Sequence, residues 1–272
     1  MSRGELLIFA PNLLAEKVAI VTGGGTGIGR GIAVELARAG ADVVLAGRRI
    51  EPLREAAEEI CALGGKAMAV STDVRDWDQV QALAAAATAE FGHVDILVNN
   101  AGGQFGAAFE DLSPNGWKAV IDVNLNGVFR CTRAVAGQMI AQRSGKIVNV
   151  IAGFSRRAAP HISHSGAARA GVENLTRSLA LEWAAHNIQV NCISPVAMTE
   201  ALGKNLESTP GGADGLRGSI PAGRFASLEE VGWLVVYLVS KAGDYITGEH
   251  IVMDGGYWLA TPVGLSRRAG EA

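Results

Sequence analysis

The feature that most constrains the fold of this chain is a glycine-rich run between a buried strand and a helix. The apolar segment Val18–Thr22 leads into Gly-Gly-Gly-Thr-Gly-Ile-Gly at positions 23–29, and an amphipathic segment follows over 29–39. Glycines in this setting permit a tight turn and let the backbone approach a pyrophosphate at the positive end of the helix. We therefore expect a dinucleotide-binding turn whose contacts come from Gly23, Thr26, Gly27, Ile28 and Gly29.

The same alternation of strand and helix continues along the chain. Short apolar runs predict strands at 18–22, 42–46, 67–71, 96–99, 145–151, 189–193 and 250–253. Longer amphipathic segments predict helices at 29–39, 51–62, 77–91, 117–143, 167–186 and 229–240. Buried strands separated by helices indicate an α/β fold, a doubly wound parallel sheet of the Rossmann type with helices on both faces.

No change of composition divides the chain, so we expect a single domain over 1–272. Within it we expect an N-terminal extension at 1–14, a mobile substrate flap at 200–227 and a C-terminal tail at 259–272. The flap is the stretch that departs from the rhythm, because it holds six glycines and two prolines.

Composition excludes several classes of function. With 49% hydrophobic and 19% charged residues among 272, the chain can bury a large core. Its net charge of −3 comes without a long run of like charge, so we expect neither nucleic-acid nor membrane partners. Three widely spaced cysteines fit neither a disulfide framework nor a zinc site, which indicates a reducing compartment and no metal. Without a run of roughly 20 apolar residues or a targeting pattern, we expect a cytoplasmic location.

The end of the second expected strand indicates which dinucleotide binds. In NAD-binding folds a carboxylate at this point holds the adenosine ribose. Here the strand ends Leu45-Ala-Gly-Arg-Arg49, so glycine occupies the acid position and two guanidinium groups follow. Arg48 and Arg49 suit a 2′-phosphate, which favours NADP(H). The alternative is that both arginines merely solvate the start of a helix.

Several motifs together resemble the short-chain dehydrogenase/reductase family over about residues 15 to 258. They are Thr22–Gly29, Asp73-Val74, Asn99-Asn-Ala-Gly102, Asn124, Leu179-Ala-Leu-Glu182 and Asp254-Gly-Gly256. The resemblance implies that Asp73 and Val74 meet the adenine and that Asn100, Ala101 and Gly102 line the cofactor. It also implies that the segment from Pro195 to Thr199 holds the nicotinamide carboxamide. A homotetramer or homodimer is expected on the same ground.

The expected catalytic segment departs from the family. Aligned through Ala170-Gly-Val172, the usual serine, tyrosine and lysine are replaced by Ala152, Ser165 and Arg169, and only Asn124 remains. The chain's tyrosines, at 237, 245 and 257, all lie in C-terminal segments and cannot restore the pattern.

The replacements change which chemistry is available. Arg169 stays protonated, so it can stabilise negative charge or hold the cofactor ribose but cannot relay a proton. Ser165 donates a hydrogen bond but is a poor acid, whereas His164 is suited to proton transfer. Two alternatives stay open. His164 could merely serve the helix entry, with Ser163 or Ser165 as the cap, and Arg169 could simply fill surface.

A second, narrower resemblance concerns the reaction. The segments His164–Val172 and Asn99–Phe105 resemble peroxisomal-type trans-2-enoyl-CoA reductases, although the tyrosine proposed for that branch is Glu173 here. Reducing an enoyl thioester leaves an enolate, which needs hydrogen-bond donors more than a tuned acid. NADPH-dependent reduction of an acyl-thioester C=C bond is therefore the leading hypothesis. An alcohol/carbonyl oxidoreductase and a cofactor-binding protein without catalysis are the alternatives.

Overall fold

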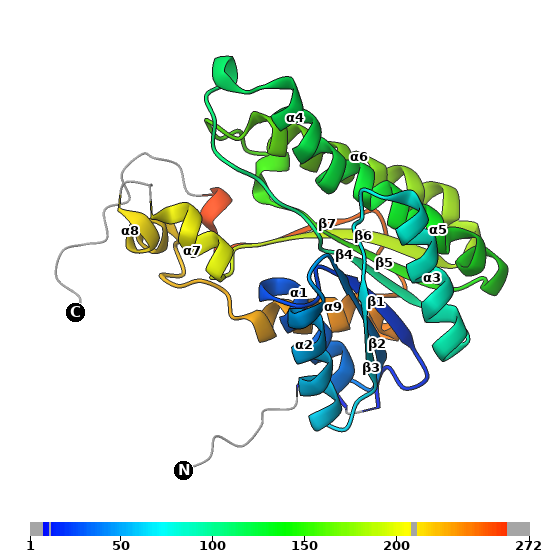
Figure 1. Cartoon of the computed structure of the whole chain (residues 1–272). Coiled ribbons are helices and arrows are strands. Elements are labelled where there is room, and N and C mark those ends of the chain that lie inside the picture. Colours follow the sequence, from blue (N-terminus) through cyan, green and yellow to red (C-terminus); the bar gives the residue numbers. More distant parts are fainter. Residues whose placement is uncertain (1–7, 11, 208–210, 260–272) are drawn as a thin grey trace, which may run out of the picture.

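The computed structural model describes residues 8–10, 12–207 and 211–259, and a parallel sheet organises them (Figure 1). The strands are β1 (Val18–Thr22), β2 (Asp42–Gly47), β3 (Ala67–Ser71), β4 (Ile96–Asn99), β5 (Gly145–Val150), β6 (Ile188–Pro195) and β7 (His250–Met253). The helices are α1 (Gly27–Arg38), α2 (Ile50–Ala62), α3 (Trp77–Phe91), α4 (Pro114–Ile121), α5 (Gly127–Gln142), α6 (Ser163–Trp183), α7 (Glu200–Leu206), α8 (Gly212–Ser219) and α9 (Leu228–Val239).

The strand order within the described residues is β3-β2-β1-β4-β5-β6-β7, and every pairing is parallel. Val21 of β1 pairs with Leu45 of β2 on one side and with Val98 of β4 on the other. The direction of winding reverses at β1 and β4, and ligands of such sheets bind at this point, beyond the carboxyl ends of the strands. The doubly wound parallel fold predicted from the sequence is confirmed.

Alternate residues of β1 supply the two cores on the two faces of the sheet. Ala19 and Val21 pack with α1, α2 and α9, whereas Val18 and Ile20 pack with α3, α5 and α6. Burial on both faces explains why the strands are continuous apolar runs without polar alternation. The two layers hold the strand ends rigid, which positions the loops that follow them.

Four boundaries differ from those expected. The helix expected at 117–143 runs from Pro114 to Gln142, and a π-helical turn at Asp122–Asn126 divides it into α4 and α5. It begins earlier than expected because Ser113 caps a helix with proline at its first position. Helix α6 begins at Ser163 instead of 167. The glycine-rich flap contains α7 and α8, and Thr199 caps the first of them.

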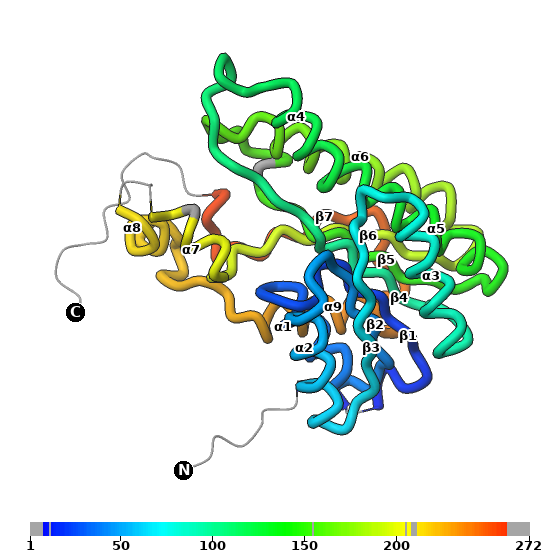
Figure 2. Tube along the Cα trace, in the orientation of Figure 1, coloured from blue at the N-terminus to red at the C-terminus, as the bar shows by residue number. Residues whose placement is uncertain are grey.

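The fourth difference concerns the N-terminal extension, which is shorter than 1–14. Leu14 is 2% exposed within the core, and its N–H donates to the carbonyl of Ala39 over 2.7 Å. Residues 1–7 and 11 of the expected extension, and 260–272 of the expected tail, lie outside the described residues. The trace in Figure 2 brings the last described turn beside the segment that follows α8, where Ala222 donates to the carbonyl of Gly255. No helix of the described ranges is long and apolar enough to cross a membrane.

Candidate active site

The glycine run forms the turn between β1 and α1. Gly23 and Gly27 have φ angles of +66° and +53°, a region that side chains rarely adopt, so both need glycine. Thr26 occupies the N-cap of α1 without a side-chain hydrogen bond, which leaves the first N–H groups of the helix to a ligand. Ile28 turns its side chain into the core.

Gly29 is closely packed against the turn. A Cβ at Gly29 would lie 2.2 Å from the carbonyl oxygen of Gly23 and 2.5 Å from Asn100 Nδ2. Gly29 therefore lets α1 pack against the turn itself. The Asn100 side chain is likewise used within the protein, since its Nδ2 donates to the carbonyls of Thr22 and Gly23 over 3.0 and 3.3 Å.

A cavity of about 510 Å³ opens beside the glycine turn. Its walls come from the turn, the ends of β2, β3 and β4, and the helix face at 119–123, and they include Gly23, Thr26, Gly47, Arg48, Arg49, Asp73, Val74, Ala101 and Gly102. A Cβ at Gly47 would meet only Leu53, at 3.6 Å, so the acid position of NAD-binding relatives stands open. Arg48 and Arg49 are both exposed at this wall. The lining fits an adenine dinucleotide with a 2′-phosphate.

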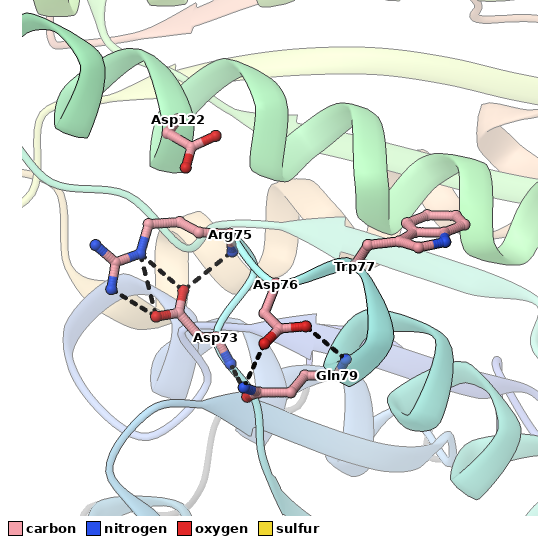
Figure 3. A pocket seen from close by; sticks show the side chains of 6 residues that line it. All are labelled: Asp73, Arg75, Asp76, Trp77, Gln79 and Asp122. Atoms are coloured by element: carbon pink, nitrogen blue, oxygen red, sulfur yellow. Dashed lines mark hydrogen bonds and ion pairs between the residues drawn. The ribbon is translucent and has the colours of Figure 1, made fainter.

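Asp73 lies at the border of this cavity and of a second one of about 520 Å³ (Figure 3). Its carboxylate accepts from Arg75 Nη2 over 2.6 Å and Nε over 2.9 Å, and its N–H donates to Gln79. The hydrogen bond from Arg75 lowers the pKa of Asp73 against the opposing effect of burial. An adenine at Asp73 would thus meet a carboxylate that Arg75 already holds.

Asn124 is placed by the π-helical turn between α4 and α5. The residue is 2% exposed, and its Nδ2 donates to the carbonyls of Val120 and Gly103 over 2.8 and 2.7 Å. Its Oδ1 accepts from the N–H of Gly103 over 3.3 Å. Asn124 therefore fixes the backbone just after the Asn99–Gly102 segment, and a wider turn at this point of a helix is typical of functional sites.

Arg169 projects from α6 toward the same backbone. Its Nη1 donates to the carbonyl of Val150, the last residue of β5, over 2.8 Å, and its Nη2 would lie 3.2 Å from a Cβ at Gly102. Burial lowers the pKa of Arg169 to about 10, so the guanidinium remains charged at neutral pH. Its Nε is buried without a partner among the described residues, a donor that a ribose hydroxyl of the cofactor could satisfy.

Ser165 and His164 are neighbours on α6, but their side chains have different surroundings. Ser165 is fully buried, and its Oγ donates to Gln104 Oε1 over 2.6 Å. His164 is equally buried, but neither ring nitrogen has a partner in the described part of the chain, and its ring meets Phe105 edge-on at 4.7 Å. The alternative in which Ser163 or Ser165 caps the helix does not hold, because Ile162 occupies the N-cap and no side chain caps α6.

Gln104 is the residue that the sequence reasoning missed. It lies in the loop after β4, and its amide nitrogen has no partner among the described residues once Ser165 binds the amide oxygen. The signal was present in the run Asn99–Phe105, where Gln104 is a polar side chain directly after the cofactor-lining residues. The hydrogen bond from Ser165 thus occupies the Gln104 oxygen and leaves the amide nitrogen as a free donor within the described part of the chain.

The carboxyl end of β6 completes the site. Pro195 is the last residue of β6, and Val196 continues along β7 by donating to the carbonyl of Met253 over 2.9 Å. Thr199 accepts from the N–H of Leu202 and so begins α7. The Thr199 methyl would lie 3.2 Å from a Cβ at Gly27, which places the start of the flap directly against the glycine turn.

Comparisons with known proteins agree with this arrangement. A family model described as enoyl-(acyl carrier protein) reductase matches residues 23–258. A Bacillus subtilis protein named "Probable 2,4-dienoyl-CoA reductase" is 39% identical over 250 residues, 90% of this chain and 98% of its own length. The Escherichia coli 2-dehydro-3-deoxy-D-gluconate 5-dehydrogenase is 38% identical over 255 residues, 93% of this chain and 100% of its own length.

A solved structure carries the same fold with a cofactor. The gluconate 5-dehydrogenase of Burkholderia cenocepacia, in complex with NADP and tartrate, superposes with a TM-score of 0.86 at 35% identity and covers 92% of this chain and 99% of its own. The glycine turn, the strand order and these matches over nearly the whole chain agree. The chain belongs to the short-chain dehydrogenase/reductase family and is an oxidoreductase with a nicotinamide-cofactor fold.

Proposed function

We propose that this protein is an NADPH-dependent reductase of the conjugated C=C bond of a trans-2-enoyl thioester. The observation that carries the proposal is the pairing of Ser165 with Gln104 beside the charged Arg169, in a site without tyrosine or lysine. These groups donate hydrogen bonds and carry positive charge, but none of them is a tuned acid. The relatives named as dienoyl-CoA reductases support the same substrate class.

The two candidate reactions place different demands on these residues. A bound nicotinamide supplies a hydride; its addition to an enoyl β-carbon puts negative charge on the thioester oxygen, whereas its addition to a ketone leaves an alkoxide that needs a proton immediately. Donors aimed at a developing oxyanion stabilise the first product without transferring a proton. Ser165 orients the Gln104 amide, Arg169 supplies charge, and Asn124 holds the backbone on which both depend. Solvent or His164 would then protonate the α-carbon.

Variants of Gln104 test the donor directly. Gln104→Glu preserves size and still accepts from Ser165, but it replaces the donating amide nitrogen by an acceptor. We expect this variant and Gln104→Ala to lower turnover of an enoyl thioester by about 10²–10³-fold, as does loss of other oxyanion donors. Arg169→Ala should have a comparable effect, whereas Ser165→Ala should be milder. Unchanged turnover in Gln104→Glu would contradict the assigned role.

The substrate class is tested by NADPH oxidation with two kinds of substrate. A trans-2-enoyl-CoA series of increasing chain length should be reduced, and simple or polyhydroxy ketones should react poorly. His164→Ala should alter the pH profile only if that imidazole delivers the α-proton. Rapid ketone reduction without enoyl-thioester turnover would overturn the proposal.

The second candidate is alcohol/carbonyl oxidoreduction. Similarity to the gluconate 5-dehydrogenases favours it, because these relatives match the chain as extensively as the dienoyl-CoA reductases do. NADPH binding without turnover of either substrate class would instead point to a cofactor-binding protein that has lost catalysis. Reversible oxidation of a sugar acid in the presence of NADP would identify the second candidate.

We also propose that the protein acts as a homotetramer or homodimer in the cytoplasm. Phe129 on α5 and Leu181 on α6 are 53% and 84% exposed, and Trp258 is 42% exposed beyond β7. Large apolar side chains on neighbouring helices favour burial against a second copy. Sedimentation that gives a monomer at micromolar concentration would contradict the assembly.

A further inference from the structure

An ion cluster surrounds a buried carboxylate on α6, one helical turn after Arg169. Its centre is Glu173 on α6, whose side chain is 6% exposed. Glu173 Oε1 accepts from Arg156 Nε over 2.7 Å and also from Arg177 Nη2. Glu173 Oε2 lies 3.2 Å from His250 Nδ1, and His250 Nε2 lies 2.8 Å from Ser194 Oγ.

The members of the cluster come from separate elements of the fold. Arg156 belongs to the segment 151–162 that follows β5, His250 begins β7, and Ser194 precedes Pro195 at the end of β6. Arg177, in contrast, is on α6 itself, four residues after Glu173. The Glu173 carboxylate thus joins α6 to the segment 151–162 and to the start of β7. Through His250 it also reaches Ser194 near the end of β6.

Glu173 remains ionised in this position. Burial alone would raise its pKa, but polar contacts with Ser155 and Arg156 outweigh that effect and lower it to about 2. Burial also lowers the pKa of His250, which favours the neutral imidazole at neutral pH. A buried carboxylate that loses a guanidinium partner keeps its desolvation cost, so the contact with Arg156 is strongly held.

The segment 151–162 is tied at its ends and in its middle. Its start follows the Val150 carbonyl that accepts from Arg169, and its His161 carbonyl accepts from Ala107 in the loop of Gln104 over 2.8 Å. Between these ends, Arg157 Nη1 donates to the carbonyl of Tyr257 over 3.0 Å. Arg156 attaches the middle of the segment to the buried carboxylate of Glu173.

We propose that Arg156 and Glu173 are positioning residues, which hold the segment 151–162 as the cleft wall between Arg169 and the Gln104 loop. The usual serine of this segment is Ala152, so the segment offers substrate no hydroxyl at that position and contributes its shape. A misplacement of about 1 Å at such a wall can cost on the order of 10²-fold in rate. The activity readout rests on the proposed enoyl-thioester reduction, whereas the exchange readout below does not.

Arg156→Met and Arg177→Met form a matched pair for the test. Each removes one guanidinium from the same Glu173 oxygen, and the two side chains are similarly exposed, at 37% and 47%. Only Arg156 comes from the cleft segment. A role in charge balance or general stability would therefore affect both variants alike, and a positioning role would affect only the first.

Hydrogen exchange of the 151–162 amides is measured in the full chain, with and without NADPH. We expect faster exchange there in Arg156→Met and wild-type exchange in Arg177→Met. With an enoyl-CoA substrate, Arg156→Met should lower kcat by about tenfold or more with a smaller change in KM. Arg177→Met should stay within about twofold of wild type, and NADPH affinity should hold in both.

Equal exchange and equal turnover in the two variants would overturn the proposal. If the wild type reduces no enoyl thioester, the proposed function fails, and the exchange comparison still decides the positioning role. If Arg156→Met does not fold, Arg156→Lys takes its place, because it keeps the charge but presents fewer donors to Glu173. Wild-type exchange over 151–162 in Arg156→Lys would then count against the inference.

Discussion

The wall formed by Gly47 and Arg48 predicts a preference for NADPH that can be altered by single substitutions. Loss of a hydrogen bond to a charged group typically costs about 1.5–3 kcal/mol, which corresponds to roughly 10- to 150-fold in affinity. Arg48 is exposed, so solvent screening favours the lower part of that range. Arg48→Ala should therefore weaken NADPH by about 10- to 30-fold and leave NADH nearly unchanged, since NADH lacks the 2′-phosphate.

Titration of tryptophan fluorescence or calorimetry measures both affinities, and Arg54→Ala is the matched control. Arg54 is an exposed arginine on α2 outside the cavity wall, so its loss changes the net charge equally. Gly47→Asp should act in the opposite sense, because the site has room for the side chain and a carboxylate would repel the phosphate while binding the ribose. Equal affinity of the wild type for the two cofactors, or an equal loss of both in Arg48→Ala, would refute the reasoning.

Three further substitutions follow from the described contacts. Gly29→Ala should shift the turn, destabilise the protein by about 1–3 kcal/mol and weaken cofactor binding, because its Cβ would lie 2.2 Å from the Gly23 carbonyl oxygen; thermal unfolding with and without NADPH measures both effects. Asn124→Ala should lower the free energy of unfolding by roughly 1–3 kcal/mol, since it leaves backbone groups of Val120 and Gly103 unpaired; denaturant unfolding measures the loss. Glu173→Gln should reveal the acid dependence of stability. A carboxyl whose folded-state pKa is lowered to about 2 stabilises the protein above its ordinary pKa of 4.5 and loses that contribution as the pH falls between these values. The difference in unfolding free energy between wild type and Glu173→Gln should shrink over that window, and a constant difference would contradict the assignment.

The strands and their parallel, doubly wound arrangement followed from sequence because burial on both faces makes most strands continuous apolar runs. The helix boundaries were less predictable where a local signal competed with periodicity. Pro114 and Ser113 begin α4 earlier than its apolar pattern does, and the glycines of 200–227 concealed α7 and α8. Periodicity reports the face that packs, whereas caps decide where a helix begins.

The site was predictable where a residue type has few uses. A glycine at 23 in the left-handed region and a cationic strand end at 48 fit few other roles, and the structure brings these two residues to one cavity. Gln104 and Glu173 escaped because glutamine and glutamate are ordinary surface residues, and only the tertiary contacts with Ser165 and Arg156 distinguish them. The functional roles of the site residues, the single domain and the cellular location stay predictions.

The charge distribution around α6 bears on the proposed reaction. Glu173 lies one turn from Arg169, but its oxygens are occupied by Arg156, Arg177 and the His250 ring. Arg169 forms no ion pair within the described residues, and burial is the cause of its lowered pKa. A buried cation without a counter-charge is stabilised by whatever negative charge forms next to it. In the proposed reduction of an enoyl thioester, an enolate oxygen would provide that charge as the reaction proceeds, whereas the ground-state thioester would not. The interaction would then strengthen in the transition state and raise kcat rather than merely lower KM.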